Sequence, residues 1–65
     1  MNLNTATAEE IAAANIERLD RKKADELVKF REENGPFNSW DDVKKVPGFN
    51  NDRIRELQKA GVTLG

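Results

Sequence analysis

The stretch KKVPGFNND, residues 44–52, combines residue types that suit phosphate binding. Its Pro-Gly step ends one helix, and asparagine is a common first residue of the next. Backbone N–H groups at such a turn can donate to a phosphate oxygen, and Gly48 lets the oxygen approach because it has no side chain. Lys44 and Lys45 precede the turn, and Arg53 follows it. A plain helix connector, with Phe49 in the core and the lysines in solvent, explains the same residues equally well.

A second basic cluster surrounds Asp20 earlier in the chain. Arg18, Arg21, Lys22 and Lys23 place four basic residues within six positions, which is the densest such cluster in the sequence. Asp20 would put a carboxylate where a phosphate binds, and like charges repel. We therefore favour Asp20 as a helix cap among solvated cations, with a side-chain phosphate contact as the alternative.

The composition excludes several kinds of chemistry. The 65 residues include no histidine and no cysteine, which removes the usual general base, the thiolate nucleophile, disulfides and the usual zinc ligands. A chain of this length also leaves little room to desolvate a carboxylate pair. We expect neither enzymatic activity nor a cofactor.

The charge balance limits how the chain can bind a nucleic acid. Eleven basic and twelve acidic residues give a net charge of −1, so any such site must be local. No apolar run approaches the length of a membrane span, and the first residues lack a signal-peptide pattern. We expect a soluble domain without membrane contact. The compartment stays open between the cytoplasm and an extracytoplasmic part of a longer membrane-anchored protein.

Helix signals account for most of the chain. Thr7 and Glu10 form a capping box ahead of an alanine-rich helix, and Asp20 caps a second helix over about 21–34 that ends at Gly35. On that second helix Arg31 shares a face with apolar residues, which predicts that it pairs with a carboxylate or extends past the core to solvent.

The second half repeats this arrangement. Ser39, with Asp42 three residues on, predicts a cap for a short helix over about 40–46. Asn50 or Asn51 caps a last helix that Gly61 ends, after which Val62 and Leu64 are expected to pack onto the core.

The two halves align as an internal repeat. Thr7 matches Ser39 and Ala14 matches Val46 at an offset of 32 residues, whereas Leu19 matches Phe49 at an offset of 30, so the first turn carries two extra residues within 15–18. Two such units, about 7–34 and 39–61, bury their apolar faces only against each other. The repeat predicts one compact, pseudo-twofold, all-α domain over residues 1–65 with four to five short helices.

The segments LNTATAEEIAAA, KKADELVKFREENGPF, SWDDVKKVPGF and IRELQKAGVTLG resemble the tandem helix-hairpin-helix domain of ComEA-type competence proteins. The resemblance covers residues 2–65 and implies a SAM-domain-like fold. It also implies binding of double-stranded DNA without sequence preference, through hairpins of the form Gly-hydrophobic-Gly. Those hairpins correspond here to 18–20 and 48–50. The site residues implied are Lys44, Lys45, Gly48, Phe49, Asn50, Asn51 and Arg53, with Arg18, Arg21, Lys22 and Lys23 at the first hairpin.

The chain departs from this pattern at both hairpins. The first, Arg18-Leu19-Asp20, has no glycine, and the second, Gly48-Phe49-Asn50, keeps one. Together with the near-zero net charge, these departures motivate a second hypothesis: a protein-interaction or scaffold module that kept the fold and lost DNA binding. Under either hypothesis a monomer is expected.

Overall fold

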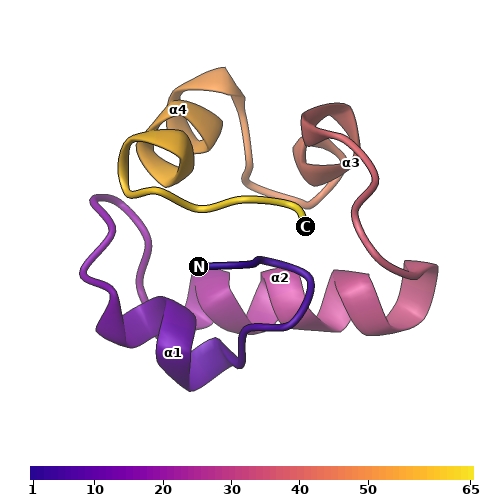
Figure 1. The fold of residues 1–65 in the computed structure, drawn as a ribbon, viewed down its shortest axis with the longest axis horizontal. Coiled ribbons are helices and arrows are strands. Elements are labelled where there is room, and N and C mark those ends of the chain that lie inside the picture. The colour runs from indigo at the N-terminus through magenta and orange to yellow at the C-terminus, as the bar shows by residue number, and fades with distance from the viewer.

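Four α-helices, joined by turns, make up the computed structural model, which describes residues 1–65. The helices are α1 (Ala8–Ala13), α2 (Arg21–Asn34), α3 (Trp40–Lys44) and α4 (Asn51–Lys59). Helix α1 packs against α2 and α3 packs against α4, and the two pairs lie on opposite sides of the domain, with both termini between them (Figure 1). The predicted all-α fold with four to five short helices is confirmed. None of the helices has the length and apolar character needed to cross a membrane.

The predicted caps of α1, α2 and α4 are confirmed. In α1 the Thr7 hydroxyl accepts from the Glu10 N–H at 3.1 Å while the Glu10 carboxylate accepts from the Thr7 N–H at 2.9 Å. Asp20 caps α2 and accepts from the Lys23 N–H at 2.9 Å. Of the two asparagines, Asn50 caps α4.

The start and end of α3 differ from the prediction. The Ser39 side chain makes no capping bond, and Asp42 instead accepts from the Asn38 N–H at 3.0 Å. The helix was expected over 40–46 but ends at Lys44, because the N–H groups of the next two residues bond three residues back, to Asp42 and Val43. This tightened last turn satisfies the final carbonyls before Pro47.

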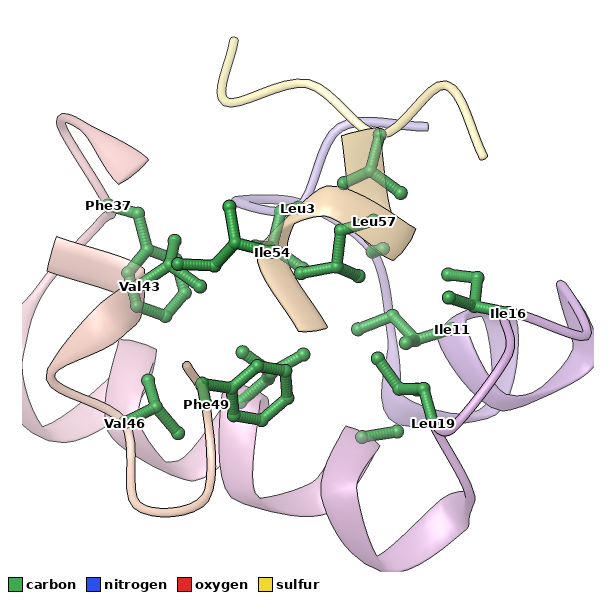
Figure 2. Close-up of a cluster of buried hydrophobic side chains, with 14 residues drawn as sticks. Leu3, Ile11, Ile16, Leu19, Phe37, Val43, Val46, Phe49, Ile54 and Leu57 are labelled. Carbon is green, nitrogen blue, oxygen red and sulfur yellow. The ribbon is translucent and has the colours of Figure 1, made fainter. Parts of the chain in front are cut away.

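The hydrophobic core draws on every helix, both turns and both ends of the chain (Figure 2). No buried residue is polar or charged. Val62 is buried and Leu64 is partly buried against the core, as predicted. The fourteen buried residues are Leu3, Ala6, Ile11, Ile16, Leu19, Ala24, Leu27, Phe37, Val43, Val46, Phe49, Ile54, Leu57 and Val62.

The internal repeat holds at the turns, with one correction. Ile16 is buried like Val46, whereas Ala14 is exposed, so Ile16 takes the place that the sequence alignment gave to Ala14. The offset is therefore 30 residues throughout the turn, and the two extra residues of the first unit lie before Ile16. Asn15, with φ of 55°, breaks the helix there.

One side-chain amide and one guanidinium hold the N-terminal segment against the rest of the domain. Asn4 donates through Nδ2 to the carbonyls of Phe37 at 3.0 Å and Leu64 at 2.7 Å, and its Oδ1 accepts from the Phe37 N–H at 2.7 Å. Arg31 was expected to pair with a carboxylate or reach solvent. It donates through Nη1 to the carbonyls of Leu3 and Ala6 at 2.8 and 2.7 Å, because the N-terminal segment passes over that face of α2.

Candidate functional site

The two hairpin turns have the same backbone geometry although their sequences differ. The first residue of each has a positive φ, 63° at Arg18 and 85° at Gly48. The second residue, Leu19 or Phe49, is buried, and its N–H donates three residues back, at 3.1 and 3.0 Å. Figure 2 shows both side chains pointing into the core. The first turn thus keeps the hairpin shape without a glycine.

Each hairpin leaves the same four backbone N–H groups without an acceptor in the protein. The two turns bond only the N–H groups of their apolar residue and of the third residue of the helix that follows. All eight of the residues with free N–H groups are exposed, so these groups can reach an anion from solvent. They belong to Arg18, Asp20, Arg21 and Lys22 in the first hairpin, and to Gly48, Asn50, Asn51 and Asp52 in the second.

The type of the third residue differs between the two helices that follow the hairpins, α2 and α4, and the other two helices, α1 and α3. In α1 and α3 it is an acid, Glu10 or Asp42, that folds back and accepts a backbone N–H next to the helix start. The Thr7 N–H and hydroxyl lower the pKa of Glu10, and the Asn38 N–H is the main cause that lowers the pKa of Asp42. In α2 and α4 the third residue is a base, Lys23 or Arg53, so the N–H of the capping residue stays free.

These two basic side chains cross between the hairpins. A Cβ at position 48 would collide with Nζ of Lys23 and lie 3.4 Å from its Cε, so the Lys23 ammonium rests on Gly48. Arg53 donates through Nη1 to the carbonyl of Arg18 in the first hairpin. Lys23 and Arg53 also line one open surface hollow, together with Ile16, Arg18, Leu19 and Asp20.

Most of the cations without an anionic partner belong to the hairpins. Four of the eleven basic residues form ion pairs, each with an acid on the same short segment, which leaves seven with no carboxylate in ion-pair range. Of those seven, Lys29 lies along α2 and Arg31 is bonded to carbonyls. The other five are in or beside the two turns in the chain: Arg18, Lys22, Lys23, Lys44 and Arg53.

The structure brings together some of the predicted site residues and separates others. Arg18, Lys23, Gly48 and Arg53 meet, and Asp20 and Asn50 cap the helices beside them. Lys22, Lys44 and Asn51 are exposed near the same turns.

Two predicted residues are engaged elsewhere. Arg21 pairs with Asp25 at 3.1 Å along α2. Lys45 pairs with Asp42 at 3.5 Å and borders hollows that contain Phe30 and Asn34, on a part of α2 far along the helix from its first turn.

One feature was missed by the sequence analysis. Arg53 was expected beside a phosphate at its own hairpin, whereas its side chain reaches the first hairpin, and Lys23 makes the reciprocal contact. The sequence did carry a signal, because Lys23 and Arg53 are equivalent at the offset of 30 residues. The structure has no group of acidic, histidine or cysteine residues arranged to hold a metal ion.

Comparison with known proteins gives one family and several partial relatives. The family model for the helix-hairpin-helix motif matches residues 1–60. ComE operon protein 1 of Bacillus subtilis is 34% identical over 98% of this chain and 30% of its own length. Kinesin-like protein KIF22 of Rattus norvegicus is 32% identical over 92% of this chain. Endonuclease/exonuclease/phosphatase family domain-containing protein 1 of Homo sapiens is 40% identical over 85%.

The match covers only part of each relative. The chain spans 30% of the bacterial protein and 9% and 10% of the two mammalian ones. No solved structure gives a significant match to the chain.

Proposed function

The chain belongs to the helix-hairpin-helix motif family, and we propose that it binds double-stranded DNA without sequence preference, through phosphate contacts at its two hairpins. In this proposal the free N–H groups of each turn donate to phosphate oxygens. Arg18, Lys22, Lys23, Lys44 and Arg53 add positive charge around them. DNA is the partner, the domain acts as a monomer, and no catalytic step is involved.

The observation that supports this proposal is the coincidence of two features at the same turns. Each turn presents four N–H groups that have no acceptor, and the cations that lack a carboxylate gather beside the same turns. Backbone N–H groups at a turn and helix start favour an anion. Four of the other six cations form ion pairs with nearby acids, so a net charge of −1 does not oppose a local phosphate site.

The absence of sequence preference follows from the kind of group that the site offers. Contacts to phosphates position a protein on DNA but carry no base information directly. The apolar residue of each hairpin, Leu19 or Phe49, is buried and so is unavailable for stacking on bases. Phe30 stacks on Phe37 with ring centroids 5.8 Å apart, so its ring already has a stacking partner.

Duplex binding measured against salt tests the proposal. Binding of a fluorescent duplex should weaken as salt rises, with a slope of about −0.9 for each phosphate contact. The variant Lys22→Ala with Lys44→Ala should reduce that slope by about 2, since each lysine contributes about one contact. The variant Lys29→Ala with Lys59→Ala removes the same charge from α2 and α4 outside the two turns and should reduce the slope less.

Two outcomes would contradict DNA binding through the hairpins. One is no detectable binding at low salt by the folded wild-type domain, and the other is an equal loss of slope in both double variants. A second duplex of unrelated sequence should bind equally well. If DNA fails to bind and a protein partner is captured with unchanged yield after nuclease treatment, the domain is instead a protein-interaction module.

A further inference from the structure

The crossed side chains of Lys23 and Arg53 carry an inference that deepens the proposed function and rests on it. We propose that the hairpins exchange their phosphate-contacting cations. Lys23, which belongs to the first unit, contacts the phosphate bound at the second hairpin, and Arg53, which belongs to the second unit, contacts the phosphate bound at the first. Each phosphate site is then built from both units.

The position of Lys23 supports the first half of this exchange. Its ammonium group rests on Gly48, whose N–H is one of the four without an acceptor in the second turn. Lys23 forms no ion pair and no side-chain hydrogen bond, and the side chain is partly buried between the hairpins. A phosphate oxygen that accepts from the Gly48 turn therefore meets an ammonium that has no other partner.

The position of Arg53 supports the second half. One of its five N–H donors bonds to the Arg18 carbonyl, which leaves others free beside the exposed N–H groups of the first turn. The one acid that lines the same hollow is Asp20, and its Oδ1 already accepts from the Lys23 N–H at 2.9 Å. The hollow that Lys23 and Arg53 share contains three cations against that one carboxylate.

The type of residue at this position explains why the side chains cross. An acid at the third residue of a helix folds back to the helix start, as Glu10 does in α1. A base cannot accept those N–H groups, so its side chain extends away from its own turn. Since the two hairpins are neighbours around the same core, the opposite turn is the surface that this side chain reaches.

The exchange is tested by amide NMR of the whole domain titrated with a short duplex at low salt. In wild type, amide signals in both turns should shift. Lys23→Ala should selectively reduce the shifts of Gly48, Asn50 and Asn51, and it should weaken binding about eightfold at about 0.1 M salt, the value of one lost phosphate contact. Lys22→Ala is the matched control: it removes the same charge from the preceding, exposed position, so it should weaken binding by a similar factor without the selective loss of shifts at Gly48, Asn50 and Asn51.

The possible outcomes separate this inference from the proposed function. If wild type does not bind the duplex, the proposed function fails and the exchange fails with it. If wild type binds but Lys23→Ala reduces the shifts of Arg18 and Arg21 instead, or reduces the shifts of Gly48, Asn50 and Asn51 no more than Lys22→Ala does, only the exchange is overturned. A DNA-free measurement adds a further check, because Lys23→Ala should shift the Gly48 signals more than Lys22→Ala does. Unchanged Gly48 signals would overturn the exchange.

Discussion

Asn4 provides the sharpest test of how this small domain is held together. Its side-chain amide joins three segments: the N-terminal segment, the turn before α3 and the C-terminal segment. Nδ2 donates to the carbonyls of Phe37 and Leu64, at 3.0 and 2.7 Å, and Oδ1 accepts from the Phe37 N–H at 2.7 Å. Asn4→Ala removes all three bonds while leaving the backbone N–H of residue 4 unchanged.

The expected loss follows from the number of bonds and their burial. Each hydrogen bond contributes about 1 kcal/mol net, so three give about 3 kcal/mol. Phe37 is only 2% exposed, and its N–H would be left without an acceptor, which adds to the cost. A domain of 65 residues has a free energy of unfolding of roughly 3–10 kcal/mol, so Asn4→Ala should remove a large part of it.

Urea unfolding followed by circular dichroism measures this effect. With a denaturant slope of about 1 kcal/mol per molar, the midpoint should fall by roughly 3 M. The control is Asn34→Ala, which removes one exposed bond from Asn34 Nδ2 to the Phe30 carbonyl at 3.2 Å and should change stability by less than about 0.5 kcal/mol. If both variants unfold within about 1 kcal/mol of wild type, the amide of Asn4 does not hold the three segments together.

Three further predictions use other contacts. Arg31→Met should cost at least about 3 kcal/mol in urea unfolding, because two charge-assisted bonds to the N-terminal segment are lost, and Arg31→Lys should recover only part of it. The folded-state pKa values of Glu10 and Asp42 are lowered, so their contribution to stability is present above pH of about 4–5 and is lost as pH falls through the lowered values. Urea midpoints measured from neutral to acidic pH should therefore fall less steeply in Glu10→Gln and Asp42→Asn than in wild type. Gly48→Ala and Gly61→Ala both place a side chain at a φ near +85° and should each cost about 1 kcal/mol, but only Gly48→Ala displaces Lys23 and should weaken duplex binding.

Local signals in the sequence were sufficient for most of the fold. The start of α2 at Asp20 and its end at Gly35 were predicted because a side-chain cap and a residue of positive φ each act over a few positions. The wrong prediction at Ser39 is equally local. Ser39 does precede the helix, but the Asp42 carboxylate accepts from the Asn38 N–H, one residue earlier in the chain. Long-range bonds could not be predicted, and Asn4 reaches 33 positions to Phe37 and 60 to Leu64.

The predicted site residues were defined by their place in the chain, and the structure adds where each side chain points. Arg53 and Lys23 were assigned to their own hairpins because sequence neighbours are the only neighbours that a sequence displays. Their true contacts, 35 positions away for Arg53, depend on how the two units pack. Lys45 was grouped with Lys44, yet a helix places adjacent residues on different faces, and Lys45 pairs with Asp42.

The first hairpin shows that glycine is not what defines this turn. Arg18 takes a positive φ of 63°, which costs a non-glycine residue about 1–2 kcal/mol. Burial of Leu19 and Ile16 on either side offsets this cost, and the Arg53 guanidinium bonds to the Arg18 carbonyl and holds the turn from the other unit. The first turn therefore presents the same free N–H groups as the second, because these contacts offset the cost of a positive φ that glycine would not incur. Removing Arg53 should consequently disturb the Arg18 turn more than its own Asn50 turn, which amide NMR of Arg53→Ala without DNA would reveal.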